Sequence, residues 1–200
     1  LLAARCANNI GNVAYYQARH DVALAHYRLA AAGFERLGFA HGLAETWINQ
    51  GIVARDLNRV PEALHAAEQA LEVAERAGRP RLVARALVSC GEAIAALGDV
   101  EMGRAQVNRG LALARREEDR LGEGEALRVL CRIARHDGRL DDAERHGREA
   151  LAIAQQLGHP EATAEVQRDL GMLYRELRRG GDAARAFVAA AALFRRLGAV

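Results

Sequence analysis

Two sets of polar residues recur at regular spacing in this sequence and are suited to binding chemistry. Side-chain amides both donate and accept hydrogen bonds, so asparagine can pair with the backbone of an extended peptide without requiring a particular sequence. Guanidinium groups bind carboxylates through parallel hydrogen bonds, so several arginines in a row suit an acidic segment or a C-terminal carboxylate. The first set includes Asn9, Asn12 and Asn49. The second set consists of Arg128, Arg132, Arg135, Arg168 and Arg175.

Patterns typical of catalysis or metal binding do not occur in the sequence. Lysine is absent, which excludes a P-loop and a Schiff base, and the 7 histidines have no HExxH or similar ligand spacing. Gly122-Glu123-Gly124 has no strand before it, and Ser89 and Cys90 have no histidine and acid in a plausible order. We therefore expect a protein that is not an enzyme and has no catalytic residues, no metal and no cofactor.

Charge and cysteine content restrict the class of partner. The formal net charge is +2, from 28 basic and 26 acidic residues, so bulk electrostatics favour neither nucleic acid nor an anionic membrane. Three distant cysteines with no CxxC pair are typical of reduced thiols in a cytoplasmic protein. The sequence begins LLAARCANNIGN, with no starting methionine and no signal-peptide pattern, so we expect it to be part of a longer chain.

A period of 40 residues organises the elements that must position these side chains. Gly11, Gly51, Gly91 and Gly171 lie on this period, and Cys131 takes the remaining place. Small residues recur 12 and 19 positions after each of them. Small side chains at fixed helical phases let neighbouring helices approach closely, so the period predicts five similar units of two helices. The expected units are 1–39, 40–79, 80–119, 120–159 and 160–200, in a single array.

The second unit shows how the two helices are delimited. Apolar or small residues follow one another at steps of three and four on both sides of a break at Asn58-Arg59-Val60. Pro61 suits the first turn of the second helix, and Gly78 suits a left-handed helix end.

These residues resemble the tetratricopeptide repeat. Trp47 with Gly51, and Gly171 with Tyr174, match the first helix of that family, and the periodic alanines match its second helix. The units are longer than the usual 34 residues or so and lack the closing proline, as in the long variant found in bacterial regulators and adaptor scaffolds. The resemblance implies an all-α, right-handed superhelical solenoid whose first helices line a concave groove. It also implies peptide contacts at the phase of Asn9 and Asn49.

The groove-facing positions change in character along the array. The first two units offer asparagines, among them Asn8, together with Tyr15, Tyr16 and Arg55, whereas the last two units offer the arginines. The alternative interpretation is a solvated face whose arginines pair with acids on their own helix. The middle units contain Gly103, Gly110 and Gly147 inside second helices, which predicts either a softer, hinge-like middle or simple sequence drift.

The last helix is apolar on nearly all sides and has no polar capping helix after it. We expect either a continuation of the array in the parent chain or a homodimer, with Phe187, Leu193 and Phe194 at the interface.

Three functions follow from these observations. The first is a protein–protein interaction module that binds a peptide or protein segment, acidic or neutral, in its concave groove, without direct contact to nucleic acid or membrane. The second is a regulatory or sensor region of a bacterial transcription factor or signalling ATPase. The third is a homo-oligomerisation segment that acts through the apolar C-terminal helix.

Overall fold

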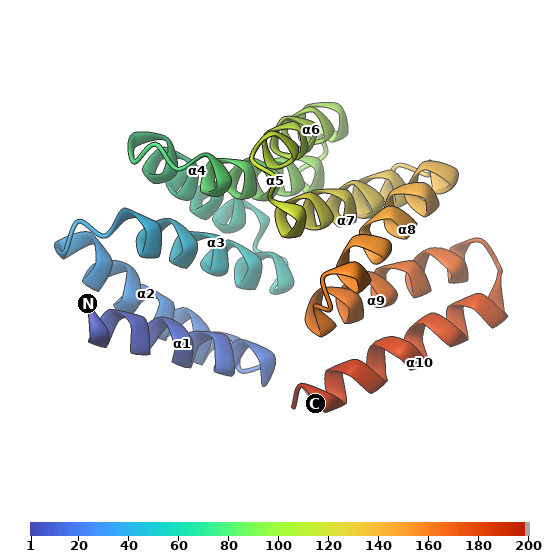
Figure 1. Cartoon of the computed structure of the whole chain (residues 1–200), viewed down its shortest axis with the longest axis horizontal. Coiled ribbons are helices and arrows are strands. Elements are labelled where there is room, and N and C mark those ends of the chain that lie inside the picture. Colours follow the sequence, from blue (N-terminus) through green and yellow to red (C-terminus); the bar gives the residue numbers. More distant parts are fainter. Residues whose placement is uncertain (199–200) are drawn as a thin grey trace. The chain divides into compact units, whose positions relative to one another are not determined.

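The computed structural model describes residues 1–198 as helices joined by short turns (Figure 1). The predicted fifth unit extends to residue 200, and its last two residues lie outside the described part. Within residues 1–198 there are ten α-helices and no strand, which confirms the predicted all-α fold of helix-turn-helix repeats. The helices are α1 (Leu2–Tyr16), α2 (His20–Arg36), α3 (Ala40–Asp56), α4 (Val60–Arg76), α5 (Pro80–Ala96), α6 (Val100–Arg116), α7 (Arg120–His136), α8 (Leu140–Gln156), α9 (Pro160–Glu176) and α10 (Gly180–Arg196).

The chain divides into two compact units. Unit 1 is Leu1–Leu113 and contains α1 to α5 and most of α6, whereas unit 2 begins at Ala114 and contains α7 to α10. In unit 1, each helix packs on the next from α1 to α5, and α3 also contacts α1 and α5. In unit 2, consecutive helices from α7 to α10 pack together, and α7 contacts α9. The first helices of successive repeats therefore lie side by side within each unit.

The left-handed turn residues recur more regularly than the glycine pattern predicted. A residue with positive φ closes helices at intervals of 20 residues, and it is a glycine at Gly38, Gly78, Gly98, Gly138, Gly158 and Gly198. Ala18, Asn58, Glu118 and Arg178 adopt the same left-handed conformation without being glycine. The following backbone N–H then bonds back into the helix, as from Arg59 to the Ala54 carbonyl oxygen at 2.8 Å. This hydrogen bond satisfies a helix-end carbonyl, so the turn forms even where a side chain makes left-handed φ costly.

In the first and last hairpins a glycine of the first helix lies close to an aromatic ring of the second helix. A Cβ on Gly11 would lie 2.6 Å from the Tyr27 ring, and one on Gly171 would lie 2.8 Å from the Phe187 ring. In the fourth repeat the large and the small residue change places. The first helix carries Cys131 where the others carry glycine, and a Cβ on Gly147 of the second helix would lie 3.1 Å from the Cys131 sulfur. Its departures from the sequence pattern are therefore a paired exchange of size and not independent drift.

The glycines of the third repeat allow two backbones to approach each other. A Cβ on Gly103 would lie 2.5 Å from the Gly91 carbonyl oxygen, and one on Gly110 would lie 2.7 Å from the Ala84 carbonyl oxygen. Their cost in helix propensity, about 1 kcal/mol each, is thus offset by tight packing of α5 against α6. The same positions hold buried alanines in the other repeats, for example Ala63 and Ala70.

Candidate functional site

The first helices of unit 1 carry a cluster of side-chain amides, which we call the amide cluster: Asn8 and Asn12 on α1 and Asn49 on α3. The Asn49 Nδ2 lies 3.4 Å from Asn8 Oδ1 and 3.3 Å from Asn12 Oδ1, and it donates to both. All three residues are half-buried. The structure therefore brings together the predicted Asn12 and Asn49, and it adds Asn8 to them.

The hydroxyl groups of Tyr27 and Thr46 contact the amide cluster and orient it. Tyr27 of α2 is buried, and its hydroxyl donates to Asn12 Oδ1 at 2.8 Å. Burial raises the pKa of the Tyr27 phenol well above its ordinary value, so this group stays a neutral donor. The Thr46 hydroxyl lies 2.7 Å from the Gly42 carbonyl oxygen and 3.1 Å from Asn8 Oδ1. Because the oxygens of Asn8 and Asn12 accept from Asn49, and that of Asn12 also from Tyr27, the Nδ2 groups of Asn8 and Asn12 are the donors left to bind an external acceptor.

The predicted Tyr15 and Arg55 belong to a second set of side-chain contacts in unit 1, which includes charged groups. The Tyr15 hydroxyl donates to Asp56 Oδ2 at 2.8 Å. Arg55 donates to Asp56 Oδ1 at 2.8 Å and to Glu92 Oε2 of α5 at 3.0 Å. Burial by itself lowers the pKa of Arg55. The Glu92 and Asp56 carboxylates outweigh this effect, so the pKa lies above its ordinary value. Arg55 thus serves as a link between two repeats.

The remaining predicted residues of unit 1 lie apart from the amide cluster. Asn9 is exposed on α1 and does not join the three clustered amides. Tyr16 is exposed, and its ring meets the Tyr15 ring edge-on with 5.3 Å between centroids.

In unit 2 the predicted arginines of α7 form ion pairs with acids of α9. Arg128 is buried and lies 3.3 Å from a Glu165 carboxylate oxygen and 3.4 Å from Asp169 Oδ2. Arg132 approaches the same Asp169 oxygen at 3.9 Å, and Arg135 pairs with Glu176. The acids come from the next repeat, whereas the alternative interpretation of the sequence expected acids on the same helix as the arginines.

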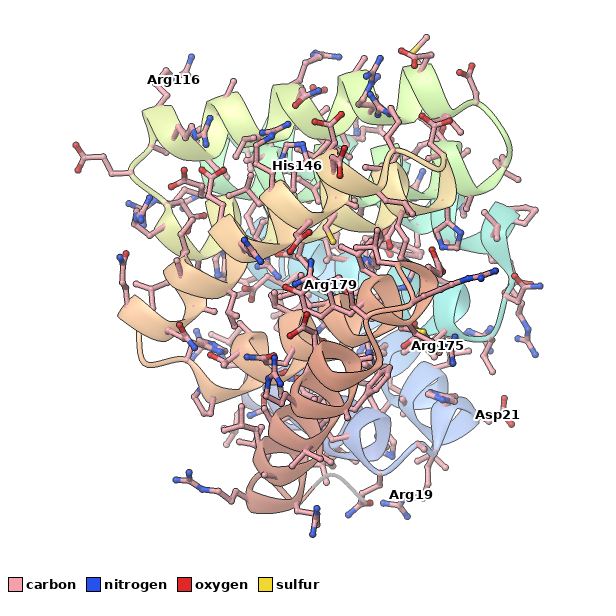
Figure 2. All side chains as sticks on the ribbon, turned by 90° about the vertical axis from the view of Figure 1, so that its right-hand side faces the viewer. Arg19, Asp21, Arg116, His146, Arg175 and Arg179 are labelled. Carbon is pink, nitrogen blue, oxygen red and sulfur yellow. The ribbon has the colours of Figure 1, made fainter. Side chains whose placement is uncertain are left out.

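Arg168 and Arg175, the predicted arginines of α9, are both exposed. Arg168 Nε lies 3.7 Å from Asp169 Oδ1. Arg175 lies 3.6 Å from the Met172 sulfur through its Nη2 atom (Figure 2). Nearby, Arg179 lies 4.6 Å from the Tyr174 ring centroid and donates to both Glu144 oxygens at 2.8 and 3.0 Å, which ties the last two repeats together (Figure 2).

These contacts obey a spacing that could have identified the missed partners. Asn8 and Asn49, Tyr15 and Asp56, and Arg128 and Asp169 are each separated by 41 positions, one repeat plus one residue. Asn12 and Asn49, and Arg55 and Glu92, are separated by 37 positions. A residue of one first helix thus contacts the residue one position after, or three positions before, its counterpart in the next repeat.

The three residues predicted for an oligomer interface lie on α10. Phe187, Leu193 and Phe194 are half-buried, and the Phe187 ring fills the space beside Gly171. The most exposed large apolar residue of this helix is Val188, at 66%.

Two of the three thiols are poorly suited to nucleophilic chemistry. Cys90 and Cys131 are buried, and burial raises the pKa of each to about 12. No three His, Cys, Asp or Glu residues within 1–198 are grouped to hold a metal ion. None of the helices in this range is long and apolar enough to cross a bilayer.

Stacked helix pairs with a polar face along their first helices define a helical-repeat scaffold for protein–protein contacts. The model of the tetratricopeptide repeat matches residues 2–76 and 125–196, and the chain belongs to this family. The unmatched interval contains α5 and α6, where glycines replace the periodic alanines.

Solved structures with the same fold are distant in sequence. A Rap protein complexed with Competence and Sporulation Factor has 18% identity and a TM-score of 0.83, over 98% of this chain and 56% of that one. Aspartyl phosphate phosphatase F from Bacillus subtilis has 15% identity and a TM-score of 0.67, over 95% of this chain and 59% of that one. A kinesin light chain with TPR-like repeats, from P. anserina, has 14% identity and a TM-score of 0.59, over 97% and 95%.

The chain thus spans little more than half the length of the Rap protein. No curated protein matches it. Repeats of this family are generally non-enzymatic, although one of these structural neighbours is an aspartyl phosphate phosphatase.

Proposed function

We propose that the chain is a protein-interaction module whose first-helix face in unit 1 binds an extended peptide segment through the amide cluster. The observation that carries this proposal is the set of three hydrogen-bonded asparagine amides on α1 and α3, with Asn12 held by Tyr27 and Asn8 beside Thr46. An extended strand offers alternating carbonyl and N–H groups, and neutral amides can match both.

The chemistry of the two units favours unit 1 as the peptide site. An acidic segment on unit 2 would compete with Glu165, Asp169 and Glu176, which already neutralise the arginines of α7. The amide cluster carries no charge, and its donors can bind an incoming carbonyl without breaking an ion pair. The Rap protein of the same fold, solved as a complex with Competence and Sporulation Factor, supports a binding role for such arrays.

A displayed-peptide selection tests the proposal. The immobilised chain is screened against random 12-residue peptides on phage, and an enriched peptide is titrated by fluorescence anisotropy. We expect dissociation constants in the micromolar range, and we expect Asn49→Ala to weaken binding about 5-fold, because a lost hydrogen bond is worth about 1 kcal/mol.

The matched control is Asn108→Ala, which removes an exposed asparagine from α6. It should leave the affinity unchanged. Equal affinities of the Asn49→Ala and Asn108→Ala variants for every enriched peptide would contradict the proposal, as would a selection that enriches none.

A further inference from the structure

The first helices of unit 1 run parallel to one another. The contacts Asn8–Asn49 and Tyr15–Asp56 join α1 to α3, and residue numbers rise in the same direction along both helices (Figure 1). The contacts between α3 and α5 follow the same order. Parallel helices have parallel dipoles, so one end of the first-helix face is positive at the helix N-termini and the other is negative at the C-termini.

Basic side chains lie at the positive end of this face, which we call the basic end: Arg5 on α1, and Arg81 and Arg85 on α5. Arg5 and Arg81 are exposed, and Arg85 is half-buried and lies 3.4 Å from Glu45 of α3. The first turns of α1, α3 and α5 contain no acid. Three guanidinium groups against the Glu45 carboxylate therefore add to the positive ends of the helices.

Carboxylates predominate at the opposite end, which we call the acidic end and which consists of Arg55, Asp56 and Glu92. The Arg55 guanidinium donates to Asp56 at 2.8 Å and to Glu92 at 3.0 Å, so two carboxylates share one cation. Histidine aside, the residues of the two ends are all the charged residues of α1, α3 and α5. The first helices of unit 1 thus carry a charge gradient along their length, in the same sense as their dipoles.

This order of charges is the reverse of the one that stabilises helices. Acids near the N-terminus and bases near the C-terminus are stabilising, and the first helices of unit 2 follow that rule. Glu123 and Glu161 stand in the first turns of α7 and α9, and Arg135 and Arg175 stand in their last turns. Helix stability therefore does not account for the gradient in unit 1, whereas a ligand of opposite polarity would be stabilised by it.

The amide cluster lies between the two ends, and its neutral groups do not fix the direction of a peptide. A strand offers carbonyl and N–H groups whichever way it runs. We propose that the basic and acidic ends fix this direction, an inference that rests on the proposed function. The peptide runs antiparallel to α1 and α3, with a basic side chain of its amino-terminal part at the acidic end and an acidic side chain of its carboxyl-terminal part at the basic end.

The length of the face sets the spacing of the two charges in the peptide. Arg85 and Glu92 are seven residues apart on α5, which corresponds to about 10 Å of helix, and an extended strand covers this distance in about three residues. The partner is therefore an extended segment in which a basic residue precedes an acidic one by about three positions or more.

Peptides selected on the chain test the order of charges. Among enriched peptides whose binding Asn49→Ala weakens, we expect a basic residue before an acidic one at this spacing. Exchanging these two residues keeps the composition and the net charge of the peptide, and it should weaken binding about 5-fold, because each charge then meets its like. The peptides are acetylated and amidated, so that terminal charges play no part.

A spin label on the bound peptide measures the direction itself. A nitroxide maleimide is coupled to a cysteine added at one end of the peptide or at the other, and the backbone amide resonances of the chain are recorded. A label at the carboxyl end should broaden the Arg5 resonance, and a label at the amino end should broaden that of Tyr15.

A charge reversal on the chain provides the matched pair of variants. Arg5→Glu should weaken the peptide about 3-fold, whereas Arg28→Glu, the same change at an exposed site of α2, should leave the affinity unchanged. Equal affinities of these two variants, the opposite label pattern, or enriched peptides without the expected order of charges would overturn the proposed direction alone, as long as Asn49→Ala still weakens binding. If Asn49→Ala has no effect, the proposed function fails and this inference fails with it.

Discussion

The first-helix faces of the two units occupy the same repeat positions and hold opposite chemistry. In unit 1 the cluster formed by Asn8, Asn12 and Asn49 is neutral and retains free hydrogen-bonding capacity. In unit 2 the corresponding helices carry arginines and acids that neutralise one another, and two of these charges, Arg128 and Asp169, are buried. One backbone geometry therefore carries a neutral amide cluster beside the Arg55–Glu92 ion pair in unit 1, and a face of buried ion pairs in unit 2.

The largest effect should come from removing Asp169, which the comparison assigns a structural role. Asp169→Ala removes a buried carboxylate that pairs with the buried Arg128, which keeps Glu165, and should lower the free energy of unfolding by about 3 kcal/mol. Glu176→Ala removes an exposed acid of the same face and should cost less than about 1 kcal/mol. Urea unfolding followed by circular dichroism measures both. Equal losses would show that the unit 2 face is not held together by its buried charges.

The hairpins of the two units should also differ in their tolerance of a methyl group. A Cβ on Gly91 meets the backbone oxygen of Gly103 at 2.5 Å, whereas a Cβ on Gly147 meets the movable end of Leu170. Gly91→Ala should therefore cost about 1–3 kcal/mol, and Gly147→Ala clearly less. Thermal unfolding of the two variants provides the test. Gly51→Ala, whose Cβ would find contacts of 3.4 Å or more, is the control and should be nearly neutral.

Acid should weaken unit 2 through Glu123. Burial raises the pKa of this carboxyl, but hydrogen bonds and charge from Arg115 and Arg120 outweigh it and lower the pKa below its ordinary value of 4.5. A carboxyl with a lowered folded pKa stabilises the fold above 4.5, and this stabilisation is lost as the pH falls through the folded pKa. Melting temperatures between pH 7 and pH 3 should fall less steeply in Glu123→Gln. Parallel curves for the two proteins would contradict this role.

The smallest effect is expected from Tyr15→Phe in unit 1. The Tyr15 hydroxyl donates to Asp56 at an exposed site, so its loss should cost no more than about 1 kcal/mol. Chemical unfolding measures the change. A loss as large as that of Asp169→Ala would mean that unit 1, too, depends on its surface polar groups.

Local sequence signals were enough to predict the fold. The 40-residue spacing of glycines and alanines identifies the helix pairs because close helix packing permits only small residues at those phases. The size exchange between Cys131 and Gly147 was not predicted, since it becomes visible only when the facing position of the second helix is known. The turns at Ala18 and Arg178 were not predicted either, because no glycine marks them. Backbone hydrogen bonds, and not the residue type, form these turns.

The candidate site was predicted less completely. Residue type and helical phase predicted asparagine and arginine positions on the first helices, but a single helix does not reveal which partner the next repeat supplies. Arg128 and Arg135 therefore looked unpaired until the acids of α9, Asp169 and Glu176, were placed beside them. Tyr27 and Thr46 were missed because their hydroxyls act from within the packed interface, where sequence suggests only core residues.

The most direct test of the account is a nuclear magnetic resonance titration with a peptide selected on the chain. The account predicts shifts in the side-chain amide resonances of Asn8, Asn12 and Asn49, with none at Asn108. Shifts confined to the arginine side chains of α7 and α9, with the amide cluster unmoved, would contradict it.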